Sequence, residues 1–201
     1  MSAEVTSIKV TLVGDSGVGK TSLLEAMKDN ELTQNYSPTI GANYEPIKYS
    51  YKNKEIVFNF WDTAGQEKYT PLTPSYLRGS QFVLVCYEKD VSDTFDNARK
   101  KWINIVKESI DTNYKIVLVE TKNDLENVDE PDLTETAEKY AKNEGFGFFS
   151  TCAITKDNVD CILAYLSQQS EEIINSVENE TNSVNHGNIN KENTKTPTAC
   201  C

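Results

Sequence analysis

The sequence predicts an α/β fold, in which a mostly parallel, six-stranded sheet carries helices on both faces. Two observations lead to this prediction. Short apolar stretches rich in β-branched residues alternate along the chain with longer segments whose apolar residues have helical spacing. A glycine-rich turn at 14–21 joins the first apolar stretch to the first helical segment. Such alternation is typical of parallel strands that are joined by crossover helices, and these helices cover both faces of the sheet.

The expected strands are short and apolar. They lie near 8–13, 44–51, 55–61, 82–87, 115–120 and 146–150. The second and third are joined at the polar turn Lys52-Asn53-Lys54, and the others are each followed by a loop or a helical segment.

The expected helices lie near 21–28, 92–110, 132–143 and 157–174. The third opens after Pro131 and stops before Gly145, as helices commonly do. Helical spacing in the second and fourth is set by Phe95, Trp102, Ile105, Val106, Ile110, Val159, Ile162, Leu163, Leu166, Ile173 and Ile174.

Length and composition indicate one domain with a tail. Residues 1–174 of the 201 form the predicted domain, whereas 175–201 are too polar to build a core and are expected to be disordered. The net charge of −11 argues against a nucleic-acid partner and against electrostatic docking on anionic lipid. Neither a signal peptide nor a membrane-spanning stretch is apparent, so a cytosolic protein is expected.

The cysteines do not have the spacing of metal ligands. Cys86 in an apolar strand and Cys161 on a helix are expected to be buried, reduced thiols. The one histidine, His186, lies in the polar tail, so neither a zinc site nor a Cys–His nucleophile is expected.

Residues 14–21, Gly-Asp-Ser-Gly-Val-Gly-Lys-Thr, have the spacing of a phosphate-binding loop between strand and helix. Backbone N–H groups of such a loop converge on phosphate oxygens at the positive end of the helix. Lys20 is expected to reach the β- and γ-phosphates and Thr21 to coordinate Mg²⁺. The sequence thus predicts a P-loop NTPase whose nucleotide-binding residues include Asp15, Ser16, Gly17, Val18, Gly19, Lys20, Thr21 and Ser22.

A second group of candidates follows the third strand, in Trp61-Asp62-Thr63-Ala64-Gly65-Gln66-Glu67. Asp62, at the end of a buried strand, is expected to hold the Mg²⁺ shell. Gly65 lets its N–H approach a γ-phosphate, and Gln66 is placed to orient an attacking water. Thr39, in the polar loop before these strands, offers a further hydroxyl for Mg²⁺.

A third motif, Thr121-Lys122-Asn123-Asp124, directly follows the strand at 115–120. The Asp124 carboxylate can accept hydrogen bonds from N1–H and the amino group of guanine, whereas adenine offers no matching donors. Lys122 is expected to lay its aliphatic stem along the base. The motif therefore predicts GTP and GDP as ligands, and it disfavours a small P-loop kinase with an adenine nucleotide.

Together these motifs resemble those of Ras-like small GTPases, specifically the Rab branch, over residues 8 to about 174 and the last two residues. The resemblance implies a GTP-hydrolysing small G domain in which Thr39 is the switch I threonine and residues 61–67 open switch II. Tyr76-Leu77-Arg78-Gly79 is similar to a Rab motif. Ser150-Thr151-Cys152-Ala153 lies where the family binds the guanine O6 through the backbone N–H of Ala153.

The chain departs from the family pattern at four positions. Thr121 replaces an asparagine, Cys152 a serine and Ile154 a lysine, and Leu32 lies where an aromatic ring usually contacts guanine. Loss of that ring removes about 0.5–1.5 kcal/mol of contact energy, so weaker nucleotide retention is expected.

The resemblance also implies the protein's partners. Cys200 and Cys201 are similar to the Rab acceptors of two geranylgeranyl groups, and two lipid chains anchor a protein stably. Tyr44, Trp61 and Tyr76 match an exposed aromatic triad that binds effectors. A monomer is implied that shuttles between the cytosol and the cytoplasmic face of an intracellular membrane, with an exchange factor, a GTPase-activating protein and a lipid-binding chaperone. The alternative is a nucleotide-dependent scaffold or signalling GTPase with weak hydrolysis.

Overall fold

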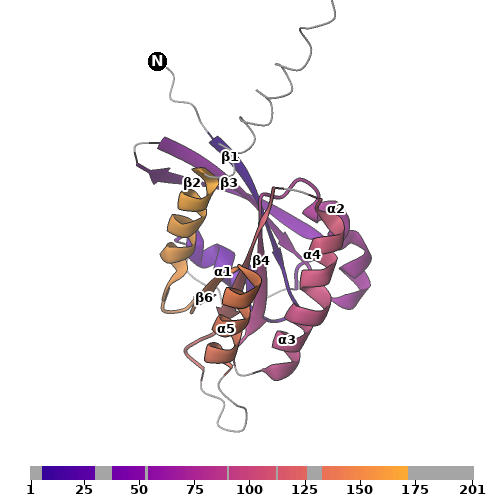
Figure 1. Ribbon diagram of the computed structural model, residues 1–201. Helices are drawn as coiled ribbons and strands as arrows, with labels where there is room; N and C mark the ends of the chain where they lie inside the picture. The colour runs from indigo at the N-terminus through magenta and orange to yellow at the C-terminus, as the bar shows by residue number, and fades with distance from the viewer. Residues whose placement is uncertain are drawn as a thin grey trace, which may run out of the picture.

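The computed structural model describes residues 6–29, 38–52, 54–89, 91–111, 113–125 and 133–171. Its strands form one six-stranded sheet in the order β2-β3-β1-β4-β5-β6 (Figure 1). Only β2 runs antiparallel to its neighbour, β3, and the other pairs are parallel. The predicted mostly parallel sheet is confirmed. The strands are β1 (Thr6–Val13), β2 (Ala42–Tyr51), β3 (Lys54–Thr63), β4 (Phe82–Glu88), β5 (Lys115–Thr121) and β6 (Gly147–Ser150).

Helices cover both faces of this sheet (Figure 1). On one face lie α1 (Lys20–Met27) and a C-terminal helix over 159–171. On the other face lie α2 (Thr73–Leu77), α3 (Ser92–Asn97), α4 (Ile103–Ser109) and α5 (Thr134–Glu144).

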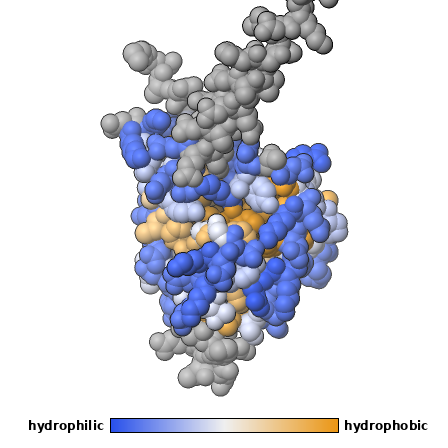
Figure 2. Space-filling model, viewed as in Figure 1, coloured by the Kyte–Doolittle hydropathy of each residue, from blue (hydrophilic) through white to orange (hydrophobic). Residues whose placement is uncertain are grey.

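The central strand β4 is apolar from Phe82 to Tyr87 because helices cover both of its faces. Phe82, Leu84 and Cys86 pack toward α1 and the C-terminal helix, whereas Val83, Val85 and Tyr87 pack toward α3 and α4. Successive side chains of a strand point to opposite faces, so a strand covered on both sides must be apolar at every position. The outer surface is mainly hydrophilic, and hydrophobic colour on this side is limited to a band between the helices (Figure 2).

Two helical segments differ from the sequence prediction. The expected helix at 92–110 contains a π turn, η2 (Ala98–Trp102), between α3 and α4. The segment after β3 forms a 3-10 helix, η1 (Glu67–Leu72), and then α2, neither of which was predicted. Both are short, and prolines at 71 and 74 replace the apolar periodicity by which a helix is recognised.

Of the two predictions about cysteines, one is confirmed and one is wrong. Cys86 is buried as expected, and burial raises the pKa of its thiol to about 12. The prediction for Cys161 was wrong, because this residue is exposed. Val159, Ile162 and Leu166 occupy the inner side of the C-terminal helix, which leaves position 161 on the solvent side. None of the described helices is long and apolar enough to cross a membrane.

Candidate functional site

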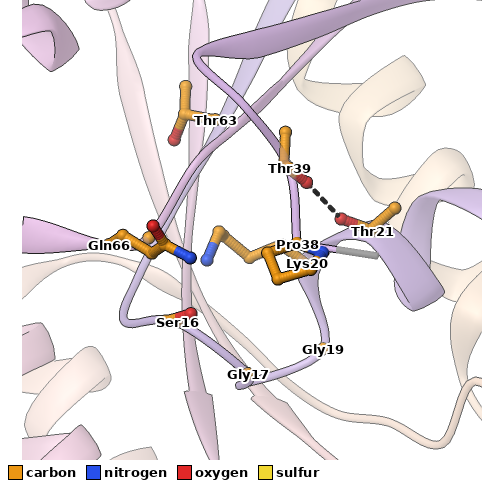
Figure 3. Close-up of a pocket in the computed structure, with 10 residues that line it drawn as sticks. Ser16, Gly17, Gly19, Lys20, Thr21, Pro38, Thr39, Thr63 and Gln66 are labelled. Carbon is orange, nitrogen blue, oxygen red and sulfur yellow. Dashed lines mark hydrogen bonds between the residues drawn. The ribbon is translucent and has the colours of Figure 1, made fainter. Parts of the chain in front are cut away.

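The loops after β1 and β3 meet the start of α1 at an open pocket. In Figure 3, Lys20 and Gln66 reach into this space from opposite walls. Eight of the lining residues were predicted from the sequence, and Pro38 and Thr63 were not. The pocket is lined by Ser16, Gly17, Gly19, Lys20, Thr21, Pro38, Thr39, Thr63, Gly65 and Gln66.

Two glycines allow these loops to pack closely. A Cβ on Gly14 would lie 2.3 Å from the carbonyl oxygen of Cys86 in β4. A Cβ on Gly65 would lie 2.4 Å from the carbonyl group of Asp15. Only glycine fits at either position. The contact of Gly65 with the phosphate loop places the following Gln66 side chain at the pocket.

Lys20, the first residue of α1, is buried although it carries a charge. Its ammonium donates hydrogen bonds to the carbonyl oxygens of Gly14, at 2.9 Å, and Asp15, at 2.7 Å. Burial lowers the pKa of Lys20, and the nearby groups Cys86, Asp62 and Asp15 oppose this effect. The ammonium is therefore held at the edge of the pocket, where an anion would gain most from it.

Three side chains from three separate segments meet beside Lys20. The Thr21 hydroxyl donates to Oδ2 of Asp62 at 2.6 Å, and the Thr39 hydroxyl lies 3.3 Å from the same oxygen. The two hydroxyl oxygens are 3.0 Å apart (Figure 3). The sequence predicted these three as metal ligands, and the structure brings them together.

The chemistry of this group suits Mg²⁺. Asp62 is fully buried, burial raises the pKa of its carboxyl, and its Oδ1 atom has no hydrogen-bond partner among the described residues. A buried, unpaired carboxylate oxygen is costly unless a cation or water satisfies it. The described residues contain no cluster of three or more His, Cys, Asp or Glu side chains. Mg²⁺ is typically held by one or two protein groups together with water and phosphate, which matches this donor set.

The motif after β5 is joined to the phosphate loop. The Thr121 hydroxyl lies within hydrogen-bond distance of the carbonyl oxygens of Val18 and Tyr87, so it links the loop to the end of β4. Lys122 pairs with Glu88 at 2.7 Å and lies next to Gly19. Thr121 thus supports the phosphate loop from behind, and it does not line the pocket.

The loop after β6 lies beside this motif. The Asn123 N–H donates to the carbonyl oxygen of Thr151 at 3.0 Å, and the Asn123 side chain bonds Asp157 at 2.8 Å. Asp124 is exposed, Ala153 is half-buried, and Cys152 is buried, where its sulfur accepts the N–H of Thr155. Asp124 and Ala153 thus come from two loops that hydrogen bonds hold together. That both face one base stays a prediction.

Glu120, in β5, has a structural role that was not predicted from the sequence. Its carboxylate is fully buried in β5 and accepts hydrogen bonds from the hydroxyls of Tyr87, at 2.7 Å, Ser150, at 2.7 Å, and Thr134, at 3.0 Å. These donors come from β4, β6 and α5. An acidic residue within an otherwise apolar strand is an unusual pattern, and this was the available signal.

The predicted aromatic triad forms a continuous contact. The ring centroids of Tyr44 and Trp61 are 5.4 Å apart, and those of Trp61 and Tyr76 are 6.0 Å apart. Tyr44 is 51% exposed, whereas Trp61 and Tyr76 are half-buried. The three rings therefore form one surface over β2, β3 and α2.

Several predicted residues lie outside the part of the chain that the structure describes. These are Leu32, the acceptor cysteines Cys200 and Cys201, and the tail from 175 onward. The remaining candidates occupy the expected elements: Ser22 lies in α1, and Ile154, which replaces the family's lysine, is 75% exposed after β6.

Comparison with known proteins places the chain in a family. A model of the Ras family matches residues 9–172. "Ras-related protein YPTC6" of Chlamydomonas reinhardtii is 37% identical over 152 residues, which are 76% of this chain and 69% of that protein. "Ras-related protein RABA2a" of Arabidopsis thaliana is 36% identical over the same length and the same shares. "GTP-binding protein ypt3" of Schizosaccharomyces pombe is also 36% identical, over 76% of this chain and 70% of its own.

The match covers most of the described domain, and the relatives exceed 30% identity over more than two thirds of both chains. The sheet order, the phosphate loop and the residues around the pocket agree with it. This chain therefore belongs to the Ras family of small GTPases, within the Rab branch.

Proposed function

We propose that this protein is a Rab-type switch of vesicle traffic, which binds GTP or GDP with Mg²⁺ in the described pocket. The observation that carries the proposal is the meeting of Thr21, Thr39 and Asp62 beside Lys20. Thr21 comes from α1, Thr39 from the segment before β2, and Asp62 from β3. A ligand at this point can hold three separate segments together, as a switch requires.

Each residue has a role in the reaction GTP + H₂O → GDP + phosphate. Lys20 provides a positive charge for the β- and γ-phosphates, and Gln66 orients the water that attacks the γ-phosphorus. Thr21, Thr39 and Asp62 hold Mg²⁺, which when bound supplies positive charge against the negative charge of the phosphates. The bond from γ-phosphorus to the bridging oxygen breaks, and GDP retains that oxygen.

The same contacts explain the switch. The γ-phosphate keeps Thr39 and Gly65 in place, and its loss releases the segments that carry them. The aromatic surface of Tyr44, Trp61 and Tyr76 spans these segments, so its shape depends on the nucleotide. Effectors would bind this surface in the GTP form, while geranylgeranyl groups on Cys200 and Cys201 would hold the protein on the membrane.

The nucleotide that accompanies the purified protein tests the proposal first. Chromatography of the released ligand should find GDP or GTP, whereas an adenine nucleotide would favour a P-loop kinase.

Hydrolysis is tested at Gln66. Gln66→Leu should lower by about a hundredfold the rate of GTP hydrolysis that a GTPase-activating protein stimulates, because the water is no longer oriented. Gln168→Leu, at an exposed position of the C-terminal helix, is the matched control. Equally low turnover of the two variants would favour the scaffold alternative, and equally high turnover would contradict the role of Gln66.

The membrane part of the proposal is tested separately. Replacing Cys200 and Cys201 with serine should abolish isoprenylation and leave the protein in the soluble fraction, with GTP binding retained. Cys161→Ser is the matched control, because this cysteine is also exposed. Membrane residence of the double-serine protein would contradict the lipid anchor.

Effector binding is tested at the aromatic surface. Trp61→Ala should still reach the membrane but lose GTP-dependent effector binding, and Trp61→Phe should retain part of this binding.

A further inference from the structure

Asp15 places a carboxylate in the phosphate loop, which is an unfavourable place for a negative charge. Nucleotide phosphates carry several negative charges, and like charges at close range repel one another. The Asp15 side chain does not line the pocket, although its neighbour Ser16 does. Some other contact must therefore keep this carboxylate turned away from the phosphates.

Two donors from a distant part of the chain make that contact. Nε1–H of Trp102 donates to Oδ1 of Asp15 at 2.8 Å, and the Asn97 amide donates to Oδ2 at 2.7 Å. Both donors are neutral, so they fix the carboxylate without removing its charge. Trp102 is fully buried beneath the sheet, and Asn97 is exposed at the end of α3.

The π turn brings these two donors to the same side of the helix. In a regular α-helix, residues five positions apart differ by about 140° around the axis and point in different directions. A π turn bonds each residue to the fifth one along, which brings positions 97 and 102 closer in direction. The turn η2 covers 98–102, and π turns are often found at functional sites.

The main chain of Asp15 makes this orientation important for the pocket. The Asp15 carbonyl oxygen accepts a hydrogen bond from the Lys20 ammonium at 2.7 Å, and the same carbonyl group lies against Gly65. A rotation of Asp15 would therefore disturb the lysine and the second switch segment as well as bring a negative charge toward the phosphates.

We propose that Asn97 and Trp102 are positioning residues, which hold the Asp15 carboxylate away from the nucleotide and so favour retention of the more highly charged GTP. The inference rests on the proposed binding of nucleotide phosphates in the pocket. Neither residue touches the nucleotide, and both act through Asp15.

The test compares release of a fluorescent GDP and a fluorescent, non-hydrolysable GTP analogue from full-length protein in Mg²⁺ by stopped flow. The double variant Asn97→Ala, Trp102→Phe removes both donors and keeps an aromatic ring in the core. We expect it to release the triphosphate about tenfold faster and the diphosphate less so, because the triphosphate carries more charge. High salt should reduce the difference.

Adding Asp15→Ala to the double variant separates electrostatics from packing. It removes the carboxylate but keeps the main-chain carbonyl, so triphosphate release should return toward the wild-type rate. Asn104→Ala, which removes another exposed amide of the same helical run, is the matched control and should have no effect. Asn97→Ala alone should show a smaller effect without any change in the core.

Two results would overturn the inference. One is unchanged triphosphate release in the double variant, and the other is faster release that Asp15→Ala does not reverse. In either case the wild-type protein still binds guanine nucleotides and the proposed function stands. A wild-type protein that bound neither nucleotide would overturn the proposed function, and this inference with it.

Discussion

Asp62 carries an electrostatic cost, because it is a carboxyl group buried at the site. Burial raises the pKa of its carboxyl above the ordinary value of 3.8, although hydrogen bonds from Thr21 and Thr39 and the charge of Lys20 act in the opposite direction. The surroundings thus disfavour the ionised form when no cation is present. Groups with shifted pKa values are often found at binding sites, where a bound ligand can stabilise the charged form.

Asp62→Asn should accordingly stabilise the protein free of nucleotide and Mg²⁺ by about 1 kcal/mol, because a neutral amide is less costly to bury unpaired than a carboxylate. A raised folded-state pKa means that the wild-type protein gains stability as pH falls through that pKa toward 3.8. The difference between variant and wild type should therefore narrow on acidification. Urea unfolding in EDTA at several pH values measures this. A less stable variant at pH 7 would show that Asp62 is satisfied without a cation.

Asp124 is expected to select the base. Asp124→Asn replaces a group that only accepts hydrogen bonds with one that also donates, so preference should shift from guanosine toward xanthosine nucleotides. Competition binding with GDP and xanthosine diphosphate measures the shift, and Asp160→Asn, at an exposed position of the C-terminal helix, serves as a control. If guanine preference is unchanged, a different residue must recognise the base.

At the scale of elements, the strands and long helices were predictable from local pattern. β4 is apolar from Phe82 to Tyr87 because both of its faces are covered there, and α5 ends at Gly145, which adopts a positive φ of 74°. The short helices η1 and α2 were not predictable, since their sequences lack a distinct period. The π turn was not predictable because it lies within a segment whose spacing predicts an ordinary α-helix. Hydrogen bonds between distant segments, such as that from Trp102 to Asp15, are not visible in the local sequence, because nothing near either residue indicates its partner.

The same limit applies to the site. The phosphate loop, the Asp62 segment and the motif at 121–124 were recognisable because each has a fixed spacing after a strand. The phosphate loop and the segment after Asp62 meet at one pocket, and the motif at 121–124 lies beside the phosphate loop. This arrangement follows from the parallel sheet, whose strands end at the same edge. The supporting role of Thr121, behind the loop, depends on the exact approach of β4 and β5 and needed the structure.

Glu120 connects the elements that present the base-recognition loops. Glu120→Leu removes the shared acceptor of hydroxyls from β4, β6 and α5, so it should lower the free energy of unfolding by about 3 kcal/mol. Because the loop after β6 carries Ala153, GDP release should also accelerate. Urea unfolding and stopped-flow release measure both effects, with Glu138→Leu, at an exposed position of α5, as the control. An equal effect of the two variants would mean that the cluster around Glu120 contributes little.

At the scale of the whole molecule, the proposed function requires the sheet to act as a fixed support for two segments, one before β2 and one after β3. The core on both faces holds the ends of β1, β3 and β5 in place, while most residues that line the pocket lie in the loops beyond these strands or at the start of α1. The segments before β2 and after β3 are joined by a hydrogen bond from Ala64 N–H to the carbonyl oxygen of Gly41, at 2.8 Å. Nucleotide-dependent change should therefore be concentrated at this junction.

Hydrogen exchange of the Ala64 amide tests the central claim, that the γ-phosphate holds the two segments together, most directly. It is measured on the same protein loaded with Mg²⁺ and either GDP or a non-hydrolysable GTP analogue, with amides of β4 as an internal reference. We predict slower exchange at Ala64 and in residues 39–41 and 65–70 in the triphosphate form, and equal exchange in β4. Equal exchange of these segments in both forms would contradict the account of this protein as a nucleotide switch.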